Sequence, residues 1–255
     1  MRFASIGSGS RGNATLISQG KTTLLVDCGF SARETEKRLQ RLNINASDLS
    51  AIVVTHEHAD HINGVRVLAR KHKLPVFATA GTAGCLAADV AEYVTEFSCH
   101  ETFNIGDIEV QPFPVPHDAR EPSQFVFHNG QHKLGLLTDV GSITPIIEEH
   151  LTACDALLLE ANHDRAMLDD GDYPEHLKYR VSGRLGHLNN VQSAKLLEKI
   201  DTSRLQHIVA MHLSEKNNSP NIVSPLFAQA LECDQSWITI AQQDTGFDWR
   251  ELTNG

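Results

Sequence analysis

One segment, residues 55–61 with the sequence THEHADH, constrains this chain more than any other feature. It follows four apolar residues that predict a buried strand. Alternate residues of an extended segment point the same way, so His56 and His58 can bind one metal ion. Asp60 and His61 follow where the chain should turn into a helix, and they can reach a second ion. Imidazole and carboxylate ligands suit Zn²⁺ or Mn²⁺, with Fe²⁺ also possible.

Four residues cannot complete two catalytic metal sites, so further ligands must come from elsewhere in the chain. Three candidates lie where a short apolar run ends and a loop is expected: His117 after FPVP, Asp139 after LLT, and His212 after VAM. The sequence therefore predicts seven ligands from four segments, gathered at the ends of strands.

The predicted elements are strands at first, and then strands that alternate with helices. The strand segments are 3–8, 15–18, 22–27, 51–55, 108–115, 124–128, 133–138, 156–160, 207–211 and 237–241. The helical segments are 31–42, 62–72, 190–200 and 222–233, with another beginning at Thr144. Ser31 predicts an N-cap, with Glu34 three residues later. This order is typical of α/β folds with mixed sheets flanked by helices. Two such halves would form a four-layer αββα sandwich, and we expect residues 1–255 to form one domain.

A glycine-rich segment near the N-terminus, GSGSRG at residues 7–12, matches the G-x-G-x-x-G pattern of dinucleotide-binding folds. That pattern works only where a helix begins, because the helix N-terminus holds the pyrophosphate. Here two strand-like runs follow, which predicts a hairpin. We therefore reject a nucleotide-binding function for this segment.

Composition indicates the cellular compartment of this protein and limits the kinds of partner that it can bind. The five cysteines form no C-x-x-C pair, which suits a reducing compartment. No leader pattern or long apolar window is present, so we expect a cytoplasmic protein without a membrane partner. A net charge of −10 argues against unspecific nucleic-acid binding. Nevertheless, residues 178–204 hold six basic residues against two acidic ones, which could form a local basic face.

The pattern H-x-H-x-D-H, followed by separated His, Asp and His, resembles the metallo-β-lactamase superfamily in its hydrolase and phosphodiesterase branch. The resemblance implies an α/β (α+β) fold with four αββα layers and two divalent metal ions. One ion would be held by His56, His58 and His117, the other by Asp60, His61 and His212, with Asp139 bridging both. Asp27, which ends the run LLVD, would orient the ligand segment from outside the metal shell.

Further motifs resemble the bacterial YycJ/WalJ group over nearly the whole chain. They are GSGSRGN at 7–13, VDCG at 26–29, HDA at 117–119, EANHD at 160–164, GHLNN at 186–190 and HLS at 212–214. This resemblance implies a 5′→3′ exonuclease acting on double-stranded DNA. The chain departs from the group at Asn189, where Ser is expected, and the neighbouring His187 is intact. The residues alone leave DNA, RNA and a small phosphodiester open as substrates, and they do not fix the oligomeric state.

Two side chains are predicted to act in catalysis. Asp60 would orient the attacking water, and His187 would donate a proton to a phosphoryl oxygen or to the leaving alkoxide. The roles of Asn162 and His163 stay open. Possible phosphate contacts are Lys178, Arg180 and Arg184. His128 and His132, which flank a turn, are expected to be exposed.

Three alternatives compete with a nuclease function. A small-molecule or cyclic phosphodiesterase like PhnP would use the same ligands. A thioester hydrolase of the glyoxalase II type would also use them, but it would not explain the segment GHL around His187. A sensor that binds metal without turnover is disfavoured by the intact ligand set and by His187.

Overall fold

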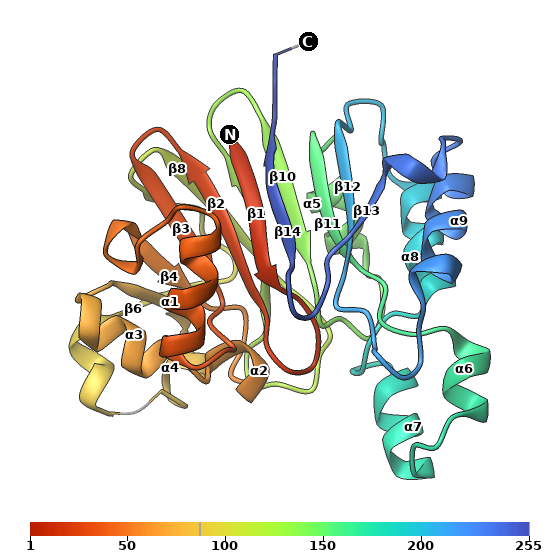
Figure 1. The fold of residues 1–255 in the computed structure, drawn as a ribbon, viewed down its shortest axis with the longest axis horizontal. Coiled ribbons are helices and arrows are strands. Elements are labelled where there is room, and N and C mark those ends of the chain that lie inside the picture. Colours follow the sequence, from red (N-terminus) through yellow and green to blue (C-terminus); the bar gives the residue numbers. More distant parts are fainter. Residues whose placement is uncertain (87, 255) are drawn as a thin grey trace.

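Two seven-stranded sheets face each other in the computed structural model, which describes residues 1–86 and 88–254 (Figure 1). The first sheet has the order β14-β1-β2-β3-β4-β5-β6, and the second has the order β13-β12-β11-β10-β9-β8-β7. The strands of the first sheet are β14 (Phe247–Glu251), β1 (Arg2–Gly7), β2 (Ala14–Gln19), β3 (Thr22–Val26), β4 (Ala51–Val53), β5 (Val76–Thr79) and β6 (Val94–Phe97). Those of the second are β13 (Ile238–Ile240), β12 (His207–Met211), β11 (Ala156–Glu160), β10 (Lys133–Leu137), β9 (Ser123–His128), β8 (Ile108–Pro114) and β7 (Phe103–Ile105).

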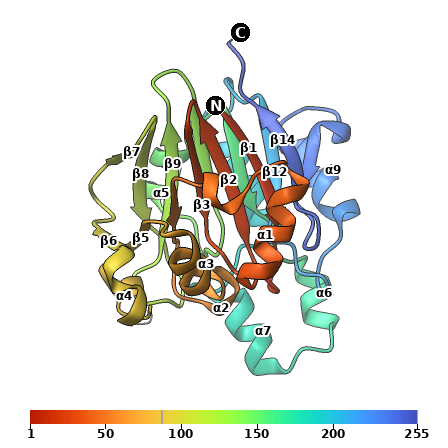
Figure 2. The ribbon, with the colours of Figure 1, turned by 60° about the vertical axis from the view of Figure 1, so that its left-hand side comes forward.

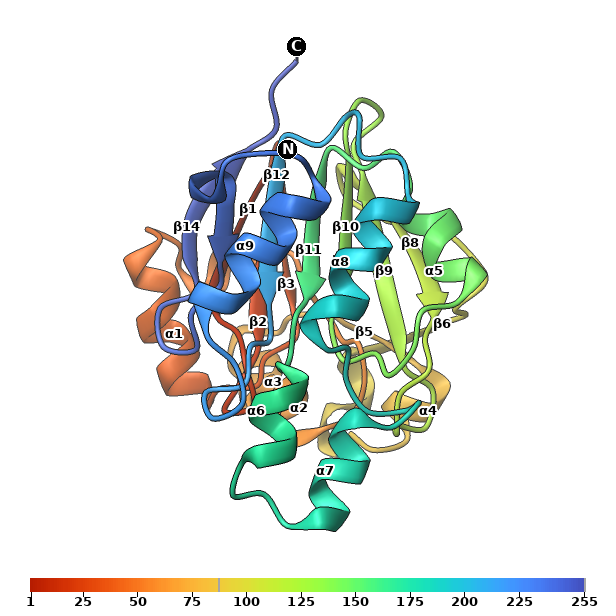
Figure 3. The ribbon, with the colours of Figure 1, turned by 90° about the vertical axis from the view of Figure 1, so that its right-hand side faces the viewer.

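Helices cover the outer face of each sheet. Those of the first half are α1 (Ala32–Arg41), α2 (Ala59–Ile62), α3 (Val65–His72) and α4 (Ala80–Ala83). Those of the second half are α5 (Pro145–Leu151), α8 (Asn190–Lys199) and α9 (Pro220–Ala230), whereas α6 (Arg165–Asp170) and α7 (Glu175–Ser182) project below the sheets. Figure 2 shows α1 and α3 in front of β1–β3, and Figure 3 shows α8 and α9 in front of β11 and β12. Short 3₁₀ helices lie at Ala46–Asp48, Ala88–Tyr93 and Gln235–Trp237.

Three apolar cores separate the four layers, because successive strand residues point to opposite faces. In β11, Leu158 packs between the sheets, whereas Leu157 and Leu159 pack against α5, α8 and α9. In β3, Leu24 packs between the sheets, and Leu25 contacts the core beneath α1 and α3. The predicted αββα sandwich is therefore confirmed.

Local predictions fare unevenly. Ser31 caps α1 by accepting a hydrogen bond from the Glu34 amide, as predicted. The helix predicted over residues 62–72 is broken, because α2 ends at Ile62 and α3 begins at Val65. His128 is half-buried and His132 is buried, contrary to expectation, and the Asn129 side chain closes their turn by accepting the amide N–H of His132.

The same edge of the sandwich collects the ends of several strands. β3 and β4 run parallel, as do β10, β11 and β12, so their carboxyl ends meet there. β8 also runs in this direction, because β9 lies antiparallel to both β8 and β10. The segments that follow these strands carry the predicted ligands.

Among the described residues, none of the helices has the length and apolar character that a bilayer span requires.

Candidate metal centre

Three histidines form one side of the cluster at this edge. One ring nitrogen from each of His56, His58 and His117 lies within 4.8 Å of the others. The His58 Nδ1 and His117 Nε2 atoms are 3.2 Å apart. His56 Nε2 is buried and has no hydrogen-bond partner among the described residues. A buried, unpaired imidazole nitrogen costs stability unless something binds it, so this atom fits a metal ligand.

Two carboxylates and two further histidines form the other side. His61 Nε2 lies 3.2 Å from Asp139 Oδ2 and 3.5 Å from Asp60 Oδ2. His212 Nε2 lies 3.8 Å from the same oxygen of Asp60. His56, His61 and Asp139 also form a close group, so Asp139 lies between the two sides. All seven predicted ligands therefore converge, and the chemistry of this donor set fits two divalent cations.

The opposite nitrogen of each imidazole faces a protein group, which fixes the ring orientation. His61 Nδ1 lies 2.7 Å from the Asp27 carboxylate. His58 Nε2 faces the Asp118 carbonyl at 3.2 Å, and His117 Nδ1 faces the Gly186 carbonyl at 3.0 Å. Carbonyl oxygens only accept hydrogen bonds, so these two nitrogens must carry the hydrogen. Their other nitrogens are then free to bind metal.

Three residues that follow the strands β3, β10 and β12 have a strained backbone. Asp27, Asp139 and His212 have φ values of 62°, 54° and 52°, in the left-handed region that non-glycine residues rarely occupy. Such strain persists only when the surroundings enforce it, and it is frequent at functional sites. The Asp27 carboxylate compensates by accepting both the amide and the hydroxyl of Thr55, each at 2.8 Å.

The glycine-rich segment forms the loop between β1 and β2, and the hairpin predicted after it is the antiparallel pair of β2 and β3. Two residues of this loop region contact the ligand segments. Asn13 Nδ2 lies 3.2 Å from Asp60 Oδ2 and 3.1 Å from His61 Nε2. Ser8 Oγ accepts the His212 amide at 2.8 Å. The sequence pattern gave no sign of these contacts, which depend on the loop folding back toward the ligand segments.

Glu160 is a buried carboxylate that the prediction missed. Its Oε1 lies 2.8 Å from His187 Nδ1, and its two oxygens accept the amides of Asp139, Val140 and Leu188. An acidic residue that ends the apolar strand ALLLE is the signal that could have revealed it. Glu160 therefore joins His187 to the strand end that delivers Asp139.

Burial and charge set the protonation of the cluster. Burial and the neighbouring His61 charge hold the pKa of His56 well below its ordinary value. Burial would raise the pKa of Asp139, but His212 and His61 hold it well below its usual range. Burial opposes protonation of His61, but Asp139 and Asp27 outweigh it and raise the pKa of His61 well above its ordinary value. Metal binds neutral imidazole and ionised carboxylate, so a metal ion at His61 would displace a proton.

Two histidines just outside the cluster respond differently to burial. Burial opposes protonation of His187, but the Glu160 carboxylate outweighs it and raises the pKa of His187 to about 9. Burial lowers the pKa of His163 to about 4, so that ring is neutral near pH 7. Asn162 braces the site, because its Nδ2 donates to the His212 carbonyl at 3.0 Å.

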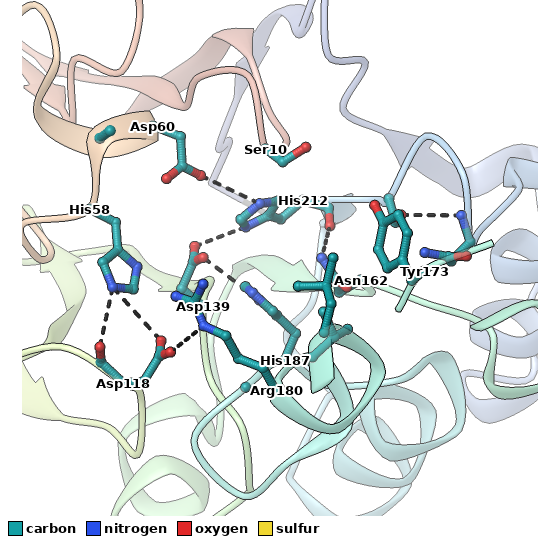
Figure 4. Close-up of a pocket in the computed structure, with 16 residues that line it drawn as sticks. Ser10, His58, Asp60, Asp118, Asp139, Asn162, Tyr173, Arg180, His187 and His212 are labelled. Atoms are coloured by element: carbon teal, nitrogen blue, oxygen red, sulfur yellow. Dashed lines mark hydrogen bonds and ion pairs between the residues drawn. The ribbon is translucent and has the colours of Figure 1, made fainter. Parts of the chain in front are cut away.

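A cavity of about 380 Å³ opens over the cluster. Figure 4 shows His58 and Asp118 at one end and Tyr173 at the other, with Asp139 and His212 between them. His187 and Asn162 also line the cavity. The basic run at 178–204 does not gather here as one face: Arg180 lines the cavity, whereas Lys199 pairs with Glu148 and Arg204 pairs with Asp155.

Comparison with known proteins identifies the class. Residues 22–212 match the family model described as a beta-lactamase superfamily domain. The chain belongs to the beta-lactamase superfamily, and it is a metal-dependent hydrolase.

Two curated relatives are similar over most of the chain. Exodeoxyribonuclease YycJ of Bacillus anthracis is 37% identical over 91% of this chain and 89% of its own length. Exodeoxyribonuclease WalJ of Streptococcus pneumoniae serotype 2 is 35% identical over 85% of this chain and 83% of its own length. The predicted resemblance to the YycJ/WalJ group is confirmed.

Solved structures match the fold over the whole chain. Zn²⁺-bound PqqB of Methylobacterium extorquens superposes with a TM-score of 0.75 at 18% identity, covering 99% of this chain and all of that one. The metallo-β-lactamase fold protein YhfI of Bacillus subtilis gives a TM-score of 0.72 at 16% identity, covering 98% of this chain and 99% of that one. At these identities the likeness defines the fold.

Proposed function

We propose that this protein is a 5′→3′ exonuclease that hydrolyses phosphodiester bonds of double-stranded DNA. The observation that carries the proposal is a donor set for two cations that shares one cavity with the His187–Glu160 pair. A thioester hydrolase needs the cations but has no use for a proton donor at this place, whereas an alkoxide leaving group requires one. The names of the curated relatives add the preference for DNA.

We propose that two divalent cations, Zn²⁺ or Mn²⁺ with Fe²⁺ as a further option, bind the cluster. His56, His58 and His117 would hold one, and Asp60, His61 and His212 the other, with Asp139 shared between them. When bound, such cations supply Lewis acidity, which polarises phosphoryl oxygens and lowers the pKa of the attacking water.

The protein's own residues then have distinct tasks. Asp60 is kept in place by Asn13, and its carboxylate can orient water for in-line attack on phosphorus. His187 lines the cavity with its Nδ1 directed at Glu160. The remaining nitrogen, Nε2, is the atom that would give its proton to the leaving alkoxide. Glu160 stabilises the positive charge on His187 before that transfer.

The two halves of the chain are joined by strand pairing and by a shared core. We propose that residues 1–255 form one domain, because β14 near the C-terminus pairs with β1 and the core between the sheets draws on both halves. All five cysteines are free thiols, which suits a reducing compartment, and we propose a cytoplasmic location.

Three substrates given to the purified protein, loaded with Mn²⁺ or Zn²⁺, test the proposal. We expect cleavage of 5′-phosphorylated duplex DNA from its 5′ end and of bis-p-nitrophenyl phosphate, with S-lactoylglutathione left intact. Thioester turnover without phosphodiester cleavage would establish the glyoxalase II alternative instead. Cleavage of bis-p-nitrophenyl phosphate and cyclic esters, with DNA left intact, would indicate a small-molecule phosphodiesterase.

A further inference from the structure

A helical arm leaves the sandwich beside the cavity. We define the α6–α7 arm as residues 164–186; it projects below the two sheets in Figures 1 and 3. None of the residues of α7 is buried, so the helix adds little to a hydrophobic core. Its inner side reaches the cavity through Leu177, Arg180 and Val181. Helix α7 therefore contributes more to the lining of the cavity than to the hydrophobic core.

Arg180 is the only arginine or lysine among the described residues that line the cavity. Its Nε lies 2.6 Å from Asp118 Oδ2, and its side chain is 61% exposed. The guanidinium group has five N–H donors in a flat fork that matches two phosphate oxygens. Within the described residues only Nε has a hydrogen-bond partner, so both terminal nitrogens can bind a ligand.

Carboxylates in the cavity favour such a cation where a polyanion must approach. Asp60, Asp118 and Asp139 all line it, in a chain of net charge −10. Bound cations would neutralise the two carboxylates that we propose as ligands. Asp118 is not in that set, and an unneutralised carboxylate repels an approaching phosphate. Arg180 cancels this charge at the entrance.

We propose that Arg180 binds a backbone phosphate of the DNA substrate next to the phosphodiester at the metal centre. Asp118 holds the guanidinium group at the cavity edge beforehand. This inference rests on the proposed nuclease function and adds the residue that separates a polymeric substrate from a small phosphodiester. Arginine suits this task because it stays charged and binds phosphate with two parallel hydrogen bonds.

The alternative is that the ion pair only fastens the arm to the loop that carries His117. The chain offers a matched control for this possibility. Arg66 on α3 has a side chain that is 56% exposed and pairs with Asp89 at 2.7 Å, but it does not line the cavity. Replacing Arg66 removes a comparable ion pair without touching the proposed phosphate contact.

The experiment compares Arg180→Ala, Arg180→Lys and Arg66→Ala as metal-loaded full-length proteins. For Arg180→Ala, we expect the KM for duplex DNA to rise roughly tenfold, with kcat within about threefold of wild type. The slope of log(kcat/KM) against log[salt] should flatten by about 1, because one phosphate contact is lost. Arg180→Lys should recover part of the loss, and Arg66→Ala should match wild type.

Bis-p-nitrophenyl phosphate separates the two explanations, because it has no neighbouring phosphate. Arg180→Ala should lose much less activity on it than on DNA, because only the unpaired Asp118 carboxylate then acts against binding. Equal losses on this substrate and on DNA would overturn the inference in favour of a structural role. An unchanged KM for DNA in Arg180→Ala would overturn the role of Arg180 and leave the proposed nuclease function standing. A wild-type protein that does not cleave DNA would overturn both.

A double-mutant cycle tests the part of Asp118. Asp118→Asn should raise the KM for DNA by about threefold, because the guanidinium group is held less firmly at the cavity edge. In the Arg180→Ala background the same change should not raise KM further and should lower it, because it removes the unpaired carboxylate that repels phosphate. Independent, additive effects of the two substitutions would contradict the claim that Asp118 acts through Arg180.

Discussion

The metal-binding edge and the α6–α7 arm lie on opposite sides of one cavity and are built on opposite principles. At the edge, His56, His61 and Asp139 are buried and enclosed by hydrogen-bonding neighbours. In the arm, α7 has no buried residue, and Glu175 and Arg180 are exposed. These three ligands at the metal-binding edge are therefore as buried as core residues although they are polar. The residues of α7, in contrast, are as exposed as those of an ordinary surface helix.

This difference separates two demands of an enzyme that works on a polymer. Bond cleavage needs groups that do not move as charge develops, and burial among fixed partners supplies that. Recognition of a long, charged substrate needs exposed groups that can exchange one partner for another. We therefore expect changes at the edge to alter metal content and kcat, and changes in the arm to alter KM.

The largest effect should come from Asp139→Asn. The substitution removes the carboxylate between the two groups of imidazoles, so metal content should fall and kcat/KM on bis-p-nitrophenyl phosphate should drop roughly a thousandfold or more. Metal analysis by mass spectrometry and initial rates check this. Asp248→Asn, an exposed change on β14, is the control. A variant with two ions and an unchanged rate would remove Asp139 from the metal centre.

A smaller loss is expected for His187→Ala, about a hundredfold to ten-thousandfold in kcat, because the proposed proton donor is lost while the ligands stay. Glu160→Gln should also lower kcat, since Gln cannot stabilise a positive charge on His187. Both variants should keep their metal ions. Rates measured with a more acidic leaving group should recover much of the loss, because that group leaves without a proton. Equal losses for all leaving groups would contradict proton donation.

Asp27→Asn probes the support behind the ligands. Asn tolerates the positive φ at this position, so the backbone should survive, but the neutral amide holds His61 Nδ1 less strongly. We expect metal affinity to weaken by roughly tenfold to a hundredfold, as is usual for groups that orient ligands. Competition with a chromogenic chelator measures it. At saturating metal the rate should approach wild type, and a rate that stays low would place Asp27 closer to the chemistry.

The sequence predicted the edge far better than the arm, for a physical reason. Buried strands carry a strong apolar pattern, and ligands at their ends follow at fixed places, which is why His117, Asp139 and His212 could be located. Glu160 was missed although it ends the apolar strand ALLLE, because its role depends on His187, which lies far from it in the sequence. α7 escaped because a helix without a buried face has no apolar periodicity to detect.

The pairing of strands that are far apart in the sequence could not be predicted either. β14 was missed because its outward positions are polar and exposed, and its place beside β1 depends on the whole sandwich. The support that Ser8 and Asn13 give to the ligand segment depends on the same closure. The ligand positions could be predicted because they follow buried strands, whereas the pairing of β14 and the contacts of Ser8 and Asn13 depend on residues far apart in the sequence.

Replacing an exposed residue of the arm should change the stability of the fold very little. The Tyr179 side chain on α7 is 76% exposed, whereas Phe113 in β8 is fully buried. Tyr179→Ala should change the free energy of unfolding by no more than about 0.5 kcal/mol, and Phe113→Ala should lower it by about 3–5 kcal/mol. Urea unfolding followed by circular dichroism measures both. A loss of several kcal/mol for Tyr179→Ala would mean that the arm belongs to the core, and its residues could not then be free to exchange partners with a substrate.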